Sequence, residues 1–243
     1  MREPRLYLDQ ELHCDLTISL PAEQTHHVCR VLRMRSGQRL WLFNGLGGSY
    51  LSEIVAIEKR LLEVKLLEFN ERDRESALQI TLLQGISRSQ HMDYTLQKAV
   101  ELGVKKIVPL ITEFGNVQLD QKKTEKKLLH WQKIIINACE QCGRNILPLI
   151  TIPAPIAQAL KEEDNASKFL LHPGADQHLS KQVSTNNALS LLSGPEGGFS
   201  PAEVKHAMDS GFITIELGPR VLRTETAAVA AISACQVLWG DMA

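Results

Sequence analysis

Two glycine-containing loops in the last third of the chain carry residue types that could bind a ligand and act on it. The first loop is Gly-Pro-Glu-Gly-Gly at residues 194–198, and the second spans residues 217–227 and contains Arg223 and Glu225. Glycines let the backbone approach a ligand closely. An arginine can stabilise a developing negative charge, and a carboxylate can orient or accept a proton. The two loops are therefore a candidate reaction site, although the glycines of the first could simply form a tight turn.

Motif spacing narrows the class of ligand. The chain contains no G-x-x-x-x-G-K-[ST] phosphate loop, and no G-x-G-x-x-G follows the first strand predicted for its second half. A nucleoside triphosphate or a dinucleotide is therefore disfavoured. A nucleoside without a polyphosphate, held through backbone groups, fits the two loops better.

The residues around these loops predict alternating strands and helices. Ser200, Pro201 and Glu203 have the spacing of an N-cap, a first-turn proline and a capping box, so a helix should begin directly after the first loop. Such alternation predicts a mostly parallel sheet covered by helices on both faces, with ligands bound at the carboxyl ends of the strands. The predicted strands are residues 78–86, 106–111, 169–172, 189–193 and 212–217, and the helices include one ending at Gly103, a long one containing 128–138, and 227–239.

The first 70 residues follow a different pattern, which is mostly β. Three strand-like segments, the first with an alternating pattern, predict a meander with short turns, preceded by one helix. Residues 70–76 are charged or polar and contain no apolar side chain, so we place the domain boundary there and predict domains at 1–73 and 74–243. The predicted elements of the first domain are a helix at 22–35 and strands at 38–43, 49–57 and 61–69.

Composition places the chain among ordinary globular proteins. It has 243 residues, of which 44% are hydrophobic, and a net charge of −1. We see no apolar run long enough to span a membrane and no secretion signal, and we expect a cytoplasmic protein without a membrane partner. The net charge alone gives no hint of a nucleic acid. However, residues 24–52 hold four arginines and no acid, whereas residues 164–243 hold eight acids and five bases.

The five cysteines are scattered and odd in number, which suggests reduced thiols. Cys139 and Cys142 have C-x-x-C spacing, but no second pair of ligands completes a zinc site. The pair also closes a helical pattern, whereas a redox pair is expected at the start of a helix. We predict that the spacing is incidental and that no metal is bound; a metal or redox role is the alternative.

Taken together, the two loops resemble the RsmE family of 16S rRNA uridine-N3 methyltransferases, which belongs to the SPOUT superfamily and uses S-adenosylmethionine. The second loop, Leu-Gly-Pro-Arg-Val-Leu-Arg-Thr-Glu-Thr-Ala, is the most specific match. Residues 1–5, 30–34, 97–104 and 140–145 also resemble the family, so the resemblance covers nearly the whole chain. It implies an N-terminal PUA-like β-barrel that helps to hold RNA, a C-terminal α/β domain with a deep trefoil knot, and a homodimer.

The resemblance also implies which residues bind the cofactor. They lie in three loops that follow three of the predicted strands. The implied cofactor-binding residues are Leu171, His172, Pro173, Ser193, Gly194, Pro195, Glu196, Gly197, Gly198, Leu217, Gly218, Val221, Leu222, Arg223, Thr224, Thr226 and Ala227.

Methylation at uridine N3 requires loss of the N3 proton, because the protonated nitrogen is a poor nucleophile. Arg223 is our candidate for the cation that stabilises the resulting anion. Glu225 and Glu196 are candidates for orienting the base or accepting its proton. Alternatively, Arg223 and Glu225 pair with each other and only fix the shape of the loop.

Candidate RNA contacts lie in the first domain, although a basic stretch can also be a merely solvated face. A second basic group, at positions 122, 123, 126 and 127, is more consistent with a solvated helix start. One departure from the family pattern is Phe114, which stands where an arginine is usual. It puts substrate contact by that loop in doubt, but we expect no contact with the cofactor loops. The candidate RNA-binding residues are Arg2, Arg5, Arg30, Arg33, Arg35 and Arg39.

Two other functions stay open on the same scaffold. One is a non-enzymatic RNA-binding or ribosome-assembly factor. The other is a SPOUT enzyme that acts on another RNA or another atom, such as a ribose oxygen. Intact cofactor loops favour an enzyme, because a pure binding protein has no need of them.

Overall fold

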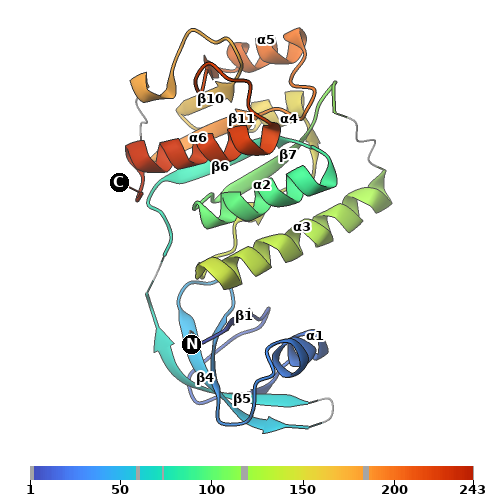
Figure 1. The fold of residues 1–243 in the computed structure, drawn as a ribbon, viewed down its shortest axis with the longest axis vertical. Helices are drawn as coiled ribbons and strands as arrows, with labels where there is room; N and C mark the ends of the chain where they lie inside the picture. Colours follow the sequence, from blue (N-terminus) through green and yellow to red (C-terminus); the bar gives the residue numbers. More distant parts are fainter. Residues whose placement is uncertain (1–2, 59–60, 73, 116–119, 183–185, 243) are drawn as a thin grey trace. The chain divides into compact units, whose positions relative to one another are not determined.

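The computed structural model describes residues 3–58, 61–72, 74–115, 120–182 and 186–242 (Figure 1). The chain divides into two compact units. The first comprises Met1–Glu75 and Cys139–Leu147, and the second comprises Ser76–Ala138 and Pro148–Ala243. None of the helices in the described ranges is long and apolar enough to cross a membrane.

The first unit is built on a five-stranded sheet in the order β1-β3-β4-β5-β2. β1 runs parallel to β3, and the other neighbours are antiparallel. Alternate side chains of these strands, such as Leu40, Leu42 and Val64, form a buried apolar core. The predicted meander is confirmed, whereas the two short strands at its edges were not predicted. The strands are β1 (Arg5–Tyr7), β2 (Thr17–Ser19), β3 (Arg39–Phe43), β4 (Ser49–Ile57) and β5 (Leu62–Asn70).

The helix of the first unit is shorter than predicted and changes type. α1 (Ala22–His26) passes into a wide π-helical turn, η1 (His27–Val31), in which the Leu32 N–H donates to the His27 carbonyl at 3.0 Å. Arg33 then adopts a left-handed backbone, with φ of 53°. The prediction of a helix through residue 35 is therefore wrong, because the chain leaves the helix before the Ser-Gly pair that was expected to stop it.

A segment from the middle of the chain completes the first unit. The Arg144 guanidinium binds the Glu75 carboxylate, with its Nε 3.0 Å from both oxygens, and the side chains are only 3% and 5% exposed. The Glu140 carboxylate accepts the N–H of Tyr7 at 2.9 Å. Nothing in the local sequence pattern indicated that residues 139–147 would join this unit.

The second unit contains a seven-stranded sheet whose main path is β12-β10-β11-β6-β7-β8, with β9 paired to β7. Every pairing in this sheet is parallel, which confirms the predicted parallel sheet. The carboxyl ends of the strands therefore meet at one edge. The strands are β6 (Gln79–Gly85), β7 (Lys106–Ile111), β8 (Leu149–Ile150), β9 (Ala154–Pro155), β10 (Ser167–Leu171), β11 (Ala188–Ser193) and β12 (Ile213–Ile215).

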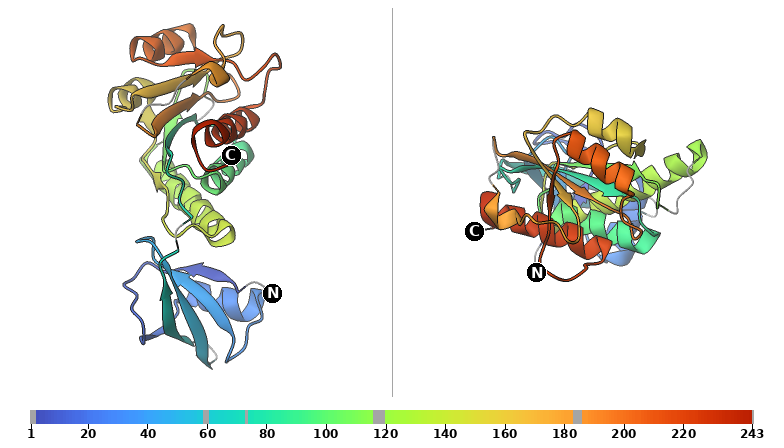
Figure 2. Two further views of the ribbon diagram at one scale, coloured as in Figure 1. Left: turned by 90° about the vertical axis from the view of Figure 1, so that its left-hand side faces the viewer. Right: turned by 90° about the horizontal axis from the view of Figure 1, so that it is seen from above.

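Helices cover both faces of this sheet, as predicted. α2 and α6 pack together on one face, and α4 and α5 pack together on the other (Figures 1 and 2). Met92, Leu96 and Val100 are buried, so the predicted inner face of α2 is confirmed. The helices are α2 (Ser89–Glu101), α3 (Gln121–Cys142), α4 (Ile156–Lys161), α5 (Pro201–Asp209) and α6 (Thr224–Trp239), with a short 3-10 turn η2 (Leu179–Lys181).

Candidate functional site

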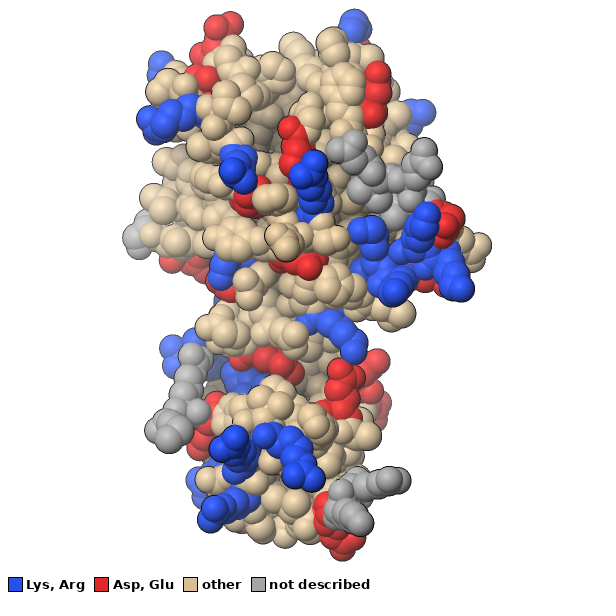
Figure 3. Space-filling view, turned by 45° about the vertical axis from the view of Figure 1, so that its right-hand side comes forward, with Lys and Arg blue, Asp and Glu red and all other residues tan. Residues whose placement is uncertain are grey.

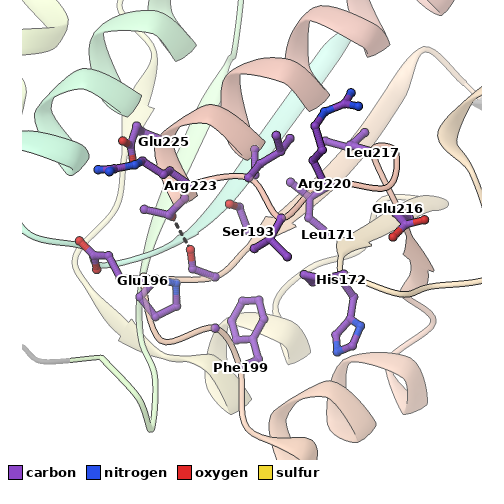
Figure 4. A pocket seen from close by; sticks show the side chains of 18 of the residues that line it. Leu171, His172, Ser193, Glu196, Phe199, Glu216, Leu217, Arg220, Arg223 and Glu225 are labelled. Carbon is purple, nitrogen blue, oxygen red and sulfur yellow. Dashed lines mark hydrogen bonds between the residues drawn. The ribbon is translucent and has the colours of Figure 1, made fainter.

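Three loops of the second unit meet at the carboxyl edge of the sheet. They follow β10, β11 and β12, and β10 lies between the other two strands, so the three loops are neighbours. Together with the start of α6 and one residue of α2, they surround a cavity of about 470 Å³ (Figure 4). That volume lies within the usual range for small-molecule sites.

Almost all of the residues that the resemblance assigned to the cofactor line this cavity; Gly197 and Thr226 are the exceptions. Both of these residues are exposed. Two of the additional lining residues, Phe199 and Glu216, directly adjoin the predicted loops. His91 lies on α2, more than 70 residues before the loop that follows β10, and no sequence motif predicted that it would line the cavity. The additional lining residues are His91, Phe199, Ile215, Glu216, Arg220 and Glu225.

A buried glutamine at the end of β6 ties two of the loops together. The Gln84 side-chain amide donates to the Thr224 hydroxyl at 3.2 Å and to the Gly194 carbonyl at 3.3 Å. The Thr224 hydroxyl in turn donates to the same Gly194 carbonyl at 2.5 Å. This network joins the loop after β11 to the start of α6, and Gln84 was not predicted to take part.

Glycines allow the close approach of β6 to the first glycine loop and the turn within that loop. A Cβ on Gly85 would lie 2.4 Å from the Pro195 side chain, so any other residue there would collide. Gly198 has φ of +69°, and its N–H donates to the Pro195 carbonyl at 2.9 Å. The tight turn that the sequence left open is therefore present, and it also lines the cavity.

The helix that follows the first loop begins as predicted. The Ser200 hydroxyl accepts the Glu203 N–H, the Glu203 carboxylate accepts the Ser200 N–H at 2.9 Å, and Pro201 occupies the first turn of α5. The other Glu203 oxygen accepts the N–H of Glu113 at 2.8 Å. The capping box therefore also fixes the loop that follows β7.

Phe114, on the loop after β7, lies against the first glycine loop. A Cβ on Gly197 would be 2.9 Å from the Phe114 Cβ and 3.0 Å from its carbonyl oxygen. The expectation that Phe114 would not touch the cofactor loops is therefore wrong. The hydrogen bond between Glu113 and Glu203 brings the two segments together, and no local pattern revealed this.

Three charged side chains lie at one end of the cavity. Figure 4 shows Arg223, Glu225 and Glu196 on one side of the view, with Glu216 and His172 on the other. Glu225 Oε1 lies 3.0 Å from His91 Nδ1, and these side chains are 15% and 29% exposed. Arg223 is exposed and makes no side-chain hydrogen bond or ion pair with any described residue. The alternative that Arg223 and Glu225 pair with each other is therefore not what the structure shows.

Glu196 differs from Glu225 in its surroundings. It is exposed on the first glycine loop, and its Oε1 accepts the N–H of Arg88 at 2.9 Å. That hydrogen bond directs the carboxylate from the end of β11 towards the start of α2. Its second oxygen has no hydrogen-bond partner within the described part of the chain.

The candidate RNA-binding arginines of the first unit fall into two groups. Arg30, Arg33, Arg35 and Arg39 are exposed, and Figure 3 shows Lys and Arg side chains gathered on the face of this unit that it presents. Arg5 is instead half-buried, donates to the Asn145 side chain at 2.5 Å and lies over the Phe43 ring at 5.1 Å. Arg2 lies outside the described residues.

The second basic group, at the start of α3, forms local contacts. Lys123 Nζ lies 3.4 Å from Asp120, and Lys127 lies over the Trp131 ring at 5.5 Å. Lys122 and Lys126 are exposed, and Figure 3 shows basic side chains gathered beside this end of the helix. These contacts suit a solvated helix start.

The C-x-x-C pair closes α3, as predicted, and both thiols are free. Burial raises the pKa of Cys139 to about 12, so this thiol is a weak nucleophile and a weak metal ligand at neutral pH. Within the described ranges, no group of three or more His, Cys, Asp or Glu side chains is arranged to hold a metal ion.

Comparison with known proteins agrees with both units. The chain matches an RNA methyltransferase PUA domain over residues 20–67 and an RNA methyltransferase domain over residues 74–236. It is 40% identical to ribosomal RNA small subunit methyltransferase E of Buchnera aphidicola from Schizaphis graminum, covering 99% of this chain and 98% of the relative. The Bacillus subtilis protein of the same name is 30% identical over 93% of each chain.

Solved structures extend the likeness to the fold. A Neisseria gonorrhoeae ribosomal RNA small subunit methyltransferase E, bound to S-adenosylmethionine, is 38% identical, with a TM-score of 0.93 over all of both chains. A Legionella pneumophila structure with the same cofactor bound is 40% identical, with a TM-score of 0.96 over all of both chains. The predicted fold class, a PUA-like domain followed by a parallel-sheet α/β methyltransferase domain, is confirmed. The chain belongs to the ribosomal RNA small subunit methyltransferase E family, the RsmE family.

Proposed function

We propose that this protein is an S-adenosylmethionine-dependent methyltransferase that methylates N3 of a uridine in 16S rRNA of the small ribosomal subunit. The observation that carries the proposal is the cavity at the carboxyl edge of the parallel sheet. It is lined by the three loops that the family resemblance assigns to the cofactor. The two full-length structural relatives described above hold S-adenosylmethionine.

The lining of the cavity fits that cofactor. Leu171, Ile215 and Leu222 offer an apolar surface for a nucleoside, and the loop backbone offers hydrogen-bonding groups. Glu216 places a carboxylate in the lining, which suits the ammonium of the methionine part. When bound, the cofactor supplies an electrophilic methyl group on its sulfonium. The protein has to position the base, stabilise its anion and accept its proton.

The charged end of the cavity supplies these functions. Arg223 is exposed and without a partner among the described residues, so its guanidinium can stabilise the negative charge on the uracil oxygens when N3 loses its proton. Glu196 is exposed, with one carboxylate oxygen held by Arg88, and its other oxygen can accept the proton. Glu225 is held by His91 and suits an orienting role. The hydrogen bonds among Gln84, Thr224 and Gly194 hold the loops that carry Arg223 and Glu196 next to each other.

The N-terminal domain, predicted as residues 1–73, holds the RNA in this proposal, and residues 74–243 carry the reaction. The exposed Arg30 and Arg33 lie on and just after the π-helical turn, with Arg35 close by. Contacts to phosphates would make the affinity for RNA fall steeply with salt. The internal contacts of Arg5 suit a structural role better than an RNA contact.

We also propose a homodimer that acts in the cytoplasm and contains the deep trefoil knot implied by the family. The dimer has support on α6, where Val237 and Leu238 are 50% and 43% exposed although the helix is otherwise packed on the sheet and on α2. These two exposed apolar side chains at the end of α6 could be buried by a second copy of the chain. Light scattering of the purified protein tests the oligomeric state.

The decisive experiment incubates the protein with methyl-labelled S-adenosylmethionine and unmodified small ribosomal subunits, followed by digestion and mapping of the label. Label at uridine N3 supports the proposal. Label on a ribose, or on tRNA, supports an enzyme with another target. Absence of label together with absence of cofactor binding supports a non-enzymatic RNA-binding protein.

A further inference from the structure

His91 and Glu225 form a histidine–carboxylate contact inside the proposed active site, between two helices. His91 lies in the first turn of α2 and Glu225 in the first turn of α6, 134 positions apart in the sequence. His91 Nδ1 lies 3.0 Å from Glu225 Oε1, and both residues line the cavity. An ionised carboxylate only accepts hydrogen bonds, so Nδ1 carries the hydrogen.

Glu225 depends strongly on this contact. Its side chain is 15% exposed, and its second oxygen, Oε2, is shielded from solvent and has no hydrogen-bond partner in the described part of the chain. A carboxylate so placed is costly unless a cation or a donor compensates it. The positive end of the α6 dipole helps, but within the described residues His91 is the one side chain at ion-pair distance.

The contact with His91 has a consequence for Arg223. Arg223 is the N-cap residue of α6, two positions before Glu225, and a free Glu225 carboxylate would be its closest source of negative charge along the chain. In the structure Glu225 is engaged by His91, and Arg223 makes no ion pair with a described residue. The guanidinium therefore stays available at the cavity.

We propose that His91 is a positioning residue that holds Glu225 and thereby keeps Arg223 free for the target base. The inference rests on the proposed function, in which Arg223 stabilises the uracil anion. Without His91, the Glu225 carboxylate turns to the Arg223 guanidinium, and the pair that forms neutralises the cation that the reaction needs. Nothing in this role requires proton transfer by the imidazole, so another side chain of similar reach that donates a hydrogen bond, such as lysine, can replace it.

The test measures single-turnover methylation of small subunits at saturating S-adenosylmethionine, and affinity for S-adenosylhomocysteine by calorimetry. His91→Ala should slow methylation by about tenfold to a hundredfold, because it removes an electrostatic contribution to the transition state. It should change the S-adenosylhomocysteine affinity by less than about threefold. His91→Lys should keep most of the rate. The double variant His91→Ala/Glu225→Gln should be faster than His91→Ala and equal in rate to Glu225→Gln alone, because no carboxylate is left to engage Arg223.

The matched control is His130→Ala, which removes the histidine of another His–carboxylate pair, in which His130 Nε2 on α3 lies 2.9 Å from Asp93 on α2. It should methylate at the wild-type rate. A wild-type rate for His91→Ala overturns the inference. So does a double variant as slow as His91→Ala, or a lysine variant as slow as the alanine variant, because His91 would then act itself.

Arg223→Ala separates failure of the inference from failure of the proposed function. If this variant binds S-adenosylhomocysteine normally and methylates at the wild-type rate, Arg223 has no part in the reaction, and the proposed mechanism fails with the inference. If it is slow while His91→Ala is not, only the inference fails. The NMR signal of the Arg223 side-chain N–H adds a readout independent of turnover. Its exchange with water should slow in His91→Ala, where the new ion pair forms, but not in the double variant.

Discussion

Replacement of Thr224 by valine removes one hydroxyl from the network that holds two cofactor loops together. Thr224 is buried at the start of α6, its hydroxyl accepts from the Gln84 amide at 3.2 Å, and it donates to the Gly194 carbonyl at 2.5 Å. Valine has nearly the same shape, so the change leaves packing intact and deletes two hydrogen bonds. Neither the Gln84 amide nor the Gly194 carbonyl loses all of its hydrogen bonds, because the Gln84 amide still donates to the carbonyls of Gly85 and Gly194 at 3.0 and 3.3 Å.

The expected loss follows from these two bonds. A net contribution of about 0.5–1.5 kcal/mol each places the loss in the free energy of unfolding at about 1–3 kcal/mol. The affinity for S-adenosylmethionine should fall as well, because the cavity loops are less well ordered before binding. The upper limit, if the whole loss appears in binding, is roughly fivefold to 150-fold.

Urea unfolding and calorimetric titration with S-adenosylmethionine measure the two effects. Thr214→Val is the matched control, because Thr214 is half-buried on β12 and its hydroxyl has no partner among the described residues; it should change neither quantity. A cycle with Gln84→Leu should show coupling of about 1 kcal/mol. Wild-type stability and affinity of Thr224→Val, or strict additivity in the cycle, would refute the reasoning.

Three further predictions concern the first unit. Arg144→Ala should lower the free energy of unfolding by about 3–5 kcal/mol in urea titrations, because the buried Glu75 carboxylate loses its bidentate partner; a loss below about 1 kcal/mol would contradict this. Burial raises the pKa of Glu140 above its ordinary value of 4.5. The contribution of Glu140 to the free energy of unfolding is therefore fully present below pH 4.5 and is lost as pH rises through the folded-state pKa. Glu140→Gln should therefore be more stable than wild type at about pH 7, by an amount that vanishes near pH 4 in the same unfolding assay. Cys139, with its pKa raised to about 12, should react with iodoacetamide only on unfolding, whereas the exposed Cys14 reacts in the folded protein; mass spectrometry of the native protein should find the label on Cys14 first.

Local patterns in the sequence identified most of the elements around the site. The segments predicted as strands at 49–57 and 106–111 match β4 and β7 with correct bounds, and the capping box placed the start of α5 correctly. These signals are local because strand alternation, capping and tight turns depend on neighbouring residues. The predicted helix over residues 22–35 was wrong because local sequence patterns do not reveal every backbone change. Neither the π-helical turn nor the left-handed backbone of Arg33 has a clear signature in single residues.

The family resemblance named the cofactor loops, and the alternation of strands and helices placed them at one edge of a parallel sheet. Neither the resemblance nor the alternation predicted the order of the strands in the sheet. Because β6 lies between β11 and β7, Gln84 reaches the loop after β11, and α2 lies close enough to α6 for His91 to reach Glu225.

The sequence by itself therefore determined the types of residue at the site, the loops that carry them and the class of fold. Only the tertiary structure decided which charges meet. It engaged Glu225 with His91, left Arg223 without an ion pair to any described residue, and brought residues 139–147 into the first unit. The physical reason is that ion pairs and buried hydrogen bonds depend on distances in space, and residues more than a hundred positions apart acquire those distances only when the sheet has formed.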